Sequence, residues 1–158
     1  MLKKYELVNP IIDNDQQLYQ IKALRNFSDV KKDDLGGFVM SEENLSHEGN
    51  CWIYDSAASL DHAQVRDDAT LAGEATLSDY AILQDKAALF DNSTASGRTI
   101  IKDNAIIFGN VDIRDHAIVS KRAIVEDDVI IRDRAIVTDD AVIEDSAVIS
   151  GNAQIRDK

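Results

Sequence analysis

A six-residue repeat runs without interruption through most of the chain and limits the folds that the chain can adopt. Written in sixes from Asp55, the first residue of each unit is Asp or Gly, with Lys121 as the exception. The third residue is small, usually Ala, and the fifth is Leu, Ile or Val in nearly every unit. Residues 49–54 fit the same frame, and residues 43–48 fit it loosely. Self-similarity at a short fixed period is typical of a solenoid, in which each repeat packs on its neighbours.

Each unit has the pattern of a short strand followed by a turn. The third to sixth residues alternate between the two faces of a strand, so the third and fifth point inward and the fourth and sixth point outward. The first two residues turn the chain, because Asp, Asn and Gly tolerate unusual backbone angles. Three strands close a triangular coil of 18 residues, and successive coils pair at about 4.8 Å. Residues 43–158 are therefore predicted to form an all-β parallel β-helix of about six coils.

The first 42 residues do not follow the repeat and form a separate region. Residues 4–8 and 18–24 alternate in polarity and predict two strands. The pair Asn9-Pro10 and the run 13–15 are typical of the turn region between them. A solenoid needs a cap over its open end. We therefore expect two domains, a small N-terminal β cap at 1–42 and the β-helix at 43–158.

The repeat resembles that of the hexapeptide-repeat proteins, in which an aliphatic residue is followed four positions later by a small one. Ile113 with Ala117 and Ile131 with Ala135 match this pattern. The segment 27–57, with Gly36-Gly37 and the run 51–55, is similar to the YdcK-like hexapeptide proteins of bacteria and prophages. The resemblance implies a left-handed winding and side-by-side homotrimers. Members of this family are often described as transferases on the strength of the fold.

Composition and charge narrow the classes of partner. The net charge is −12, which disfavours direct nucleic-acid binding because such binding needs Lys and Arg to displace counterions. Cys51 is the single cysteine, so an internal disulfide and a cysteine metal cluster are excluded. The chain shows no signal peptide and no apolar run that would span a membrane. We expect a cytoplasmic protein without membrane contact, metal or cofactor.

The acidity has a simple explanation in turn chemistry. Without the aspartates at the first position of the units, the charge of residues 43–158 changes from −11 to +2. The alternative is that these carboxylates form rows that imitate nucleic acid and bind a basic or nucleic-acid-binding protein. The thirteen corner aspartates are Asp55, Asp61, Asp67, Asp79, Asp85, Asp91, Asp103, Asp115, Asp127, Asp133, Asp139, Asp145 and Asp157.

Stacking the units by 18 residues places apolar side chains in outward columns. Such columns exceed what a soluble monomer usually exposes, so we expect them to be an interface of a homo-oligomer, with a trimer favoured. The other interpretation is that scattered exposed aliphatic residues are normal. The aromatic group near Trp52 and Phe90 is an alternative docking place for the cap. The candidate interface residues are Ile82, Ile100, Ile118 and Ile136 on one face, and Ile106, Ile124, Phe90 and Phe108 on the next.

The chain stops at Asp157-Lys158, directly after a repeat, so we also consider end-to-end pairing of the last coil. His47 falls at an inward position and is expected to be structural. A basic and aromatic column follows one corner of the acidic prism, and it is a possible ligand site. Its members are His62, Tyr80, Arg98, His116 and Arg134.

Three functions fit these features. The first is a non-enzymatic, homo-oligomeric binding or scaffold protein, including a phage-type protein that inhibits a partner, because the repeats run without a loop that would carry catalytic groups. The second is an acyltransferase, as the family resemblance implies. It would use acyl-coenzyme A in a cleft between neighbouring prisms, with His116 as general base and Arg98 and Arg134 near the cofactor phosphates. The third is the acidic mimic.

Overall fold

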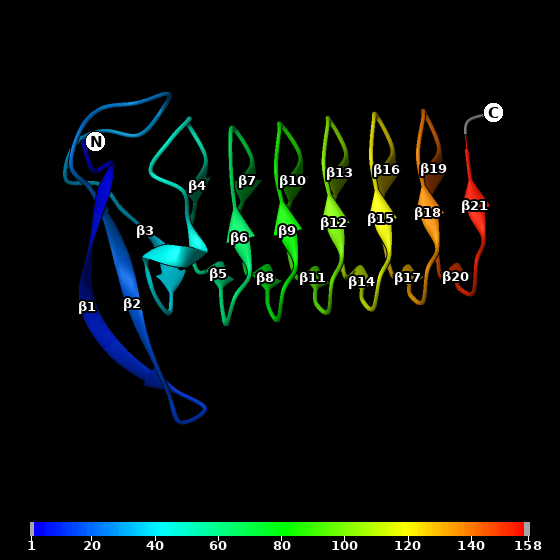
Figure 1. Cartoon of the computed structure of the whole chain (residues 1–158), viewed down its shortest axis with the longest axis horizontal. Helices are drawn as coiled ribbons and strands as arrows, with labels where there is room; N and C mark the ends of the chain where they lie inside the picture. Colours follow the sequence, from blue (N-terminus) through cyan, green and yellow to red (C-terminus); the bar gives the residue numbers. More distant parts are fainter. Residues whose placement is uncertain (1, 157–158) are drawn as a thin grey trace.

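The computed structural model describes residues 2–156 as a prism of stacked triangular coils with a β hairpin at its N-terminal end (Figure 1). The predicted all-β parallel β-helix is confirmed, with six coils of three strands from β4 to β21. Helix among the described residues is limited to one 3-10 turn, η1 (Glu42–Asn44). Successive strands pass from the rear to the bottom and then to the front as the chain runs rightward in Figure 1, which is a left-handed winding.

Three parallel sheets form the sides of the prism, and each is named after its first strand. The β4 sheet contains β4 (Trp52–Ile53), β7 (Thr70–Leu71), β10 (Ala88–Leu89), β13 (Ile106–Ile107), β16 (Ile124–Val125) and β19 (Val142–Ile143). The β5 sheet contains β5 (Ala58–Ser59), β8 (Thr76–Leu77), β11 (Thr94–Ala95), β14 (Asp112–Ile113), β17 (Ile130–Ile131) and β20 (Val148–Ile149). The β6 sheet contains β6 (Gln64–Val65), β9 (Ile82–Leu83), β12 (Ile100–Ile101), β15 (Ile118–Val119), β18 (Ile136–Val137) and β21 (Gln154–Ile155).

Residues 18 positions apart are neighbours along the prism. Ile100 pairs with Ile118 in parallel register, and the N–H of Ile100 donates to the carbonyl oxygen of Ala117 at 3.1 Å. The third and fifth residues of the units fill the interior, as predicted, and Ala117 and Val119 are fully buried. The narrow coil leaves space for only a small residue beside each corner and an aliphatic one at mid-strand, which explains the Ala and Ile/Leu/Val positions of the repeat.

Aspartate suits the corners for two reasons. Asp85 has a φ of 60°, in the left-handed region that costs most L residues about 1–2 kcal/mol but that Asp adopts more readily. Its Oδ2 also accepts a hydrogen bond from the backbone N–H of Asp103, one coil further on, at 3.0 Å. Nine more corner aspartates make the same bond to the next coil: Asp55, Asp61, Asp67, Asp79, Asp91, Asp103, Asp115, Asp127 and Asp133.

An antiparallel hairpin of β1 (Tyr5–Asp13) and β2 (Gln16–Ala23) precedes the prism. Its turn is at residues 14–15, which both have positive φ. The prediction that Asn9-Pro10 belongs to the turn region is wrong, because both residues lie within β1 beside a register shift. Asn9 has a φ of 50°, and such a bulge lets a proline, which has no N–H to donate, lie in an edge strand.

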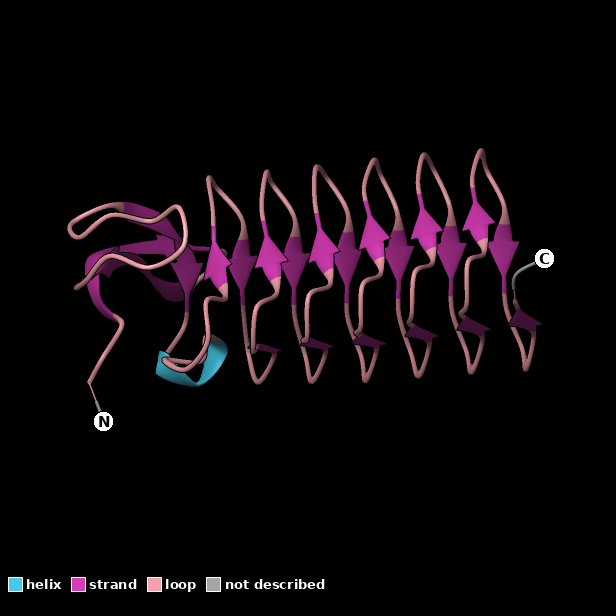
Figure 2. Cartoon of the chain, turned by 90° about the horizontal axis from the view of Figure 1, so that it is seen from above, coloured by secondary structure: helices cyan, strands magenta, loops and turns pink. Residues whose placement is uncertain are grey.

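The hairpin continues into the prism through β3 (Leu35–Val39), a strand that the sequence pattern did not predict. β3 pairs antiparallel with β2 and parallel with β5. The β5 sheet therefore extends without a break from β20 to β1 and has nine strands. Figure 2 shows the hairpin closing the N-terminal end of the stacked coils.

His47 fastens the N-terminal strand to the first coil and is structural, as expected. Its ring stacks on Tyr5 with centroids 4.1 Å apart. Nδ1 accepts the N–H of Lys4 at 3.1 Å, and Nε2 lies 2.7 Å from the Glu42 carboxylate. These contacts join residues far apart in the sequence, so the cap and the first coil form one packed unit.

No helix within residues 2–156 is long and apolar enough to cross a membrane. Asp157 and Lys158, on which the end-to-end hypothesis depends, lie outside the described residues.

Candidate functional site

In the predicted ligand column, the three residues nearest the N-terminus, His62, Tyr80 and Arg98, contact one another from one coil to the next. The His62 and Tyr80 rings are stacked, with centroids 5.0 Å apart and planes at 13°. The Arg98 guanidinium, one coil further on, lies over the Tyr80 ring, 4.7 Å from its centroid. His62 Nδ1 is also 3.4 Å from a carboxylate oxygen of Glu43. Tyr80 thus lies between the His62 ring and the Arg98 guanidinium, and 50% of its surface stays exposed.

The other two members of the column lie further along the same corner and are both exposed. His116 and Arg134 border an open hollow of about 410 Å³, together with Asp115 and Asp133. No side-chain hydrogen bond or ring contact among residues 2–156 joins His116 to Arg98 or Arg134. A general base is usually oriented by a second group, so the prism alone does not assemble such a site around His116.

The isoleucine column of the β6 sheet is half-buried along its length. Ile82, Ile100, Ile118 and Ile136 stand in register, one per coil, and neighbouring β-branched side chains shield one another across strands. The second and sixth residues of these units, on either side of the column, include no Asp or Glu, although corner aspartates such as Asp115 and Asp133 lie next to the second position. The basic ones are Arg66, Arg98, Lys102, Arg134 and Arg156.

The outward side of the β4 sheet is apolar in its middle coils. Phe90, Phe108, Ile106 and Ala72 line a hollow of about 580 Å³, and the corner residues Asp55, Gly73 and Asp91 border it. Ile106 is 39% exposed, and Ile124 follows it one coil further on in the same column. Beyond the hollow the sheet becomes acidic, and its outward acidic residues there are Glu126, Asp140 and Glu144.

The cap covers the first coil of the β4 sheet. Trp52 is in an outward position but only 2% exposed, because the rings of Phe27 and Tyr5 pack edge-on against it at 5.3 and 6.3 Å. The Tyr54 hydroxyl donates to Asp29 at 2.6 Å. The interpretation that the aromatic residues near Trp52 receive the cap therefore holds for Trp52, whereas Phe90 stays outside that contact.

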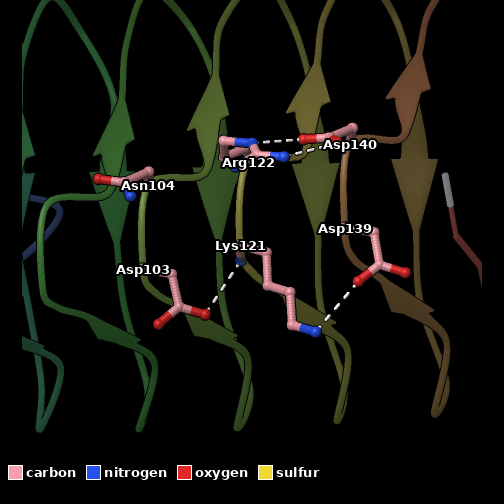
Figure 3. Close-up of a pocket in the computed structure, with 6 residues that line it drawn as sticks. All are labelled: Asp103, Asn104, Lys121, Arg122, Asp139 and Asp140. Carbon is pink, nitrogen blue, oxygen red and sulfur yellow. Dashed lines mark hydrogen bonds and ion pairs between the residues drawn. The ribbon is translucent and has the colours of Figure 1, made fainter.

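Another hollow lies around the one corner unit that begins with lysine (Figure 3). It has a volume of about 610 Å³, and Asp103 and Asn104 complete its lining beside two ion pairs. Lys121 Nζ is 3.1 Å from Asp139, and Arg122 holds Asp140 through two hydrogen bonds of 2.5 and 2.7 Å.

Those two bonds lower the pKa of the Asp140 carboxyl. Lys121 stood out in the sequence as the exception to the repeat, but the two ion pairs were not predicted. Both join residues that are 18 positions apart, so the period of the coil is the signal that would have predicted them.

The corner carboxylates are engaged within the fold. Ten of them accept a backbone N–H from the next coil, as described above, so the acidity has a structural cause. Carboxylate oxygens of Glu126, Asp127 and Glu144 lie within 4.8 Å of one another. Acidic residues at neighbouring corner positions are expected from the repeat itself.

A buried lysine is a feature that the sequence analysis missed. Lys4 is fully buried, and its Nζ donates to the carbonyl oxygens of Cys51 and Gly49 at 2.6 and 3.3 Å. Nζ is also 3.4 Å from the Cys51 sulfur. Burial lowers the pKa of Lys4 and raises the pKa of the Cys51 thiol. The pair ties β1 to the first coil.

Comparison with known proteins gives one partial match. Over 41 residues, or 26% of the chain, the sequence is 49% identical to an Escherichia coli (strain K12) protein named uncharacterized acetyltransferase YdcK. The matched region is 13% of the length of that protein. No family model matches the sequence. The β-helix and this partial match together fit the hexapeptide-repeat proteins.

Proposed function

We propose that the protein is a non-enzymatic binding or scaffold protein that acts as a homo-oligomer through the outward faces of its sheets. The observation that carries the proposal is the regularity of the coils. From Trp52 to Arg156 each described strand is followed by the same corner, and no inserted loop gathers acid, base and nucleophile. What the prism presents instead is a continuous apolar column with a basic border on the β6 sheet.

Self-association through this column has a clear driving force. An isoleucine that passes from fully exposed to fully buried contributes on the order of 1.5–3 kcal/mol. The four isoleucines of the column are already half-buried in the single chain, so each contributes only part of that amount on association. The resemblance to hexapeptide-repeat proteins favours a trimer. A cytoplasmic setting is part of this proposal. A phage-type protein that inhibits a host partner is one form of this function.

The test is the mass of the protein by light scattering, for the wild type and for Ile100→Glu combined with Ile118→Glu. We expect the wild type to be an oligomer and the double variant to be a monomer with an unchanged circular dichroism spectrum. Thr76→Glu combined with Ile130→Glu is the matched control, because both residues point outward from the β5 sheet. A wild-type monomer would overturn the proposal.

A second candidate is an acyltransferase, which the partial match to a protein named as an acetyltransferase favours. Under this function His116 is the general base, and Arg98 and Arg134 bind the phosphates of coenzyme A. Coenzyme A should then raise the melting temperature, and Arg134→Ala should reduce the shift. Calorimetry that shows no binding of coenzyme A or acetyl-coenzyme A to the oligomer would exclude this candidate.

The acidic mimic has less support. Its carboxylate rows are already used as acceptors within the prism, so their presence does not call for an external basic partner.

A further inference from the structure

The β4 and β6 sheets share one corner of the prism, which begins with residues such as Asp85 and Asp103. Strands of the β6 sheet run toward this corner, and strands of the β4 sheet leave it. Two outward rows therefore lie at the far edges of these sheets. The basic row, at the start of the β6-sheet strands, contains His62, Tyr80, Arg98, His116 and Arg134. The aromatic–acidic row, at the end of the β4-sheet strands, contains Tyr54, Ala72, Phe90, Phe108, Glu126 and Glu144.

The two rows are matched in height. In a ring whose axis runs along the prism, all copies lie at the same level, whatever their number. Tyr80 comes eight residues after Ala72 and ten before Phe90 in a coil of 18, so it lies at a height between them. Every other member of the basic row is placed in the same way between two members of the aromatic–acidic row.

Chemistry agrees with this register at each end. Tyr80 is exposed and held by His62 and Arg98. Ala72 is the small residue in the aromatic–acidic row, and with Phe90 it lines a hollow whose floor is apolar and whose border carries Asp55 and Asp91, carboxylates that could accept a hydrogen bond from the tyrosine hydroxyl. In a ring that joins the β6 sheet of one copy to the β4 sheet of the next, Tyr80 would face this hollow.

Further along the same ring, Arg134 would lie at a height between Glu126 and Glu144 of the second copy. Its guanidinium can bind either carboxylate. Arg98 falls between Phe90 and Phe108, where a guanidinium can stack on an aromatic ring.

The β5 sheet does not offer the same match. Its row at the strand ends contains serines together with Arg114 and Arg132, which would repel Arg98 and Arg134. The hairpin also extends the β5 sheet rather than the other two (Figure 1). Within residues 2–156 the N-terminal region contacts the outward side of the β4 sheet at its first coil, where Phe27 and Tyr5 pack against Trp52.

We infer that the partner of the β6 sheet is the β4 sheet of a second copy of this chain, with Tyr80 entering the hollow beside Ala72 and Arg134 pairing with Glu126 and Glu144. The inference rests on the proposed homo-oligomer and specifies its contact and register. The contact is heterologous, with different surfaces on the two copies, and it builds a ring.

The first test is cysteine crosslinking in the full chain. Tyr80→Cys combined with Ala72→Cys should give covalent dimers and larger ladders on a non-reducing gel. The matched control is Tyr80→Cys combined with Glu126→Cys, because residue 126 is in the same row as residue 72 but three coils further on. Native Cys51 is fully buried and stays in both variants.

The second test is a charge exchange. Arg134→Glu should weaken association at least tenfold in sedimentation equilibrium, and adding Glu126→Lys and Glu144→Lys should restore it. Crosslinking of the control pair, or an oligomer that neither pair crosslinks, would overturn the register and leave the proposed function standing. A wild-type monomer would overturn both.

Discussion

Oδ2 of Asp85 accepts a hydrogen bond from the backbone N–H of Asp103 across one coil, at 3.0 Å. The same bond recurs along all three corners, so the aspartate side chains link each coil to the next by hydrogen bonds. Within residues 2–156 the N–H of Asp103 donates to no backbone carbonyl, so without the carboxylate of Asp85 it would need water as its partner.

Asp85→Ala should lower the free energy of unfolding by about 2 kcal/mol. The variant loses one hydrogen bond, about 1 kcal/mol, and places alanine at a φ of 60°, which costs about 1–2 kcal/mol. Urea unfolding followed by circular dichroism measures the change. Asp85→Asn keeps an acceptor and a residue that tolerates this conformation, so it should lose well under half as much. Equal losses for the two variants would contradict the role of the Asp85 side chain as a hydrogen-bond acceptor between coils.

Thr99→Val should stabilise the protein by roughly 1 kcal/mol. Thr99 is fully buried, and its hydroxyl has no hydrogen-bond partner within residues 2–156. A buried polar group without a partner costs about 1–3 kcal/mol, and valine has nearly the same shape. The matched control is Ser93→Ala, which removes a hydroxyl that donates to Gly109 and accepts from Val111 and should destabilise. Unfolding midpoints that move in the same direction would reject this explanation.

Glu42 should make the cap sensitive to acid. Hydrogen bonds from His47 and Lys3 lower the pKa of its carboxyl below the ordinary value of 4.5. A carboxyl with a lowered folded pKa contributes stability above its unfolded pKa and loses it as the pH falls through the folded pKa. The urea concentration at the unfolding midpoint should therefore decrease as the pH is lowered below 4.5. Glu42→Gln should make this dependence on pH less steep. A slope that is the same for both proteins would show that other carboxyls govern the acid response.

Phe27→Ala should expose the single tryptophan of the chain. Phe27 is 7% exposed and packs against Trp52, and loss of a core phenylalanine costs about 3–5 kcal/mol at a fully packed site. The expected readout is a red shift of tryptophan fluorescence with coils that stay folded by circular dichroism. Phe108→Ala, at an outward position of a distant coil, should leave the emission maximum unchanged. An unchanged maximum in Phe27→Ala would mean that the cap does not shield Trp52.

Contacts between residues 18 positions apart in the sequence could be predicted. The period alone brought His62 next to Tyr80 and Ile100 next to Ile118, because parallel strands in a regular coil leave one register. The same rule implied the contact of Arg122 with Asp140. Outside the repeat this rule gives no information, and there β3 was missed and Asn9-Pro10 was assigned to the turn.

The sequence by itself determined the coil, its interior and its corners, because each unit meets the same local requirements for a strand and a turn. Only the tertiary structure decided which outward residues are covered. Trp52 and Ile106 occupy equivalent positions, yet one is buried and the other is exposed. Lys4 is likewise buried by Gly49 and Cys51, far from it in the sequence. The physical reason is that these contacts come from the non-repeating cap, whose packing depends on residues distant in the chain.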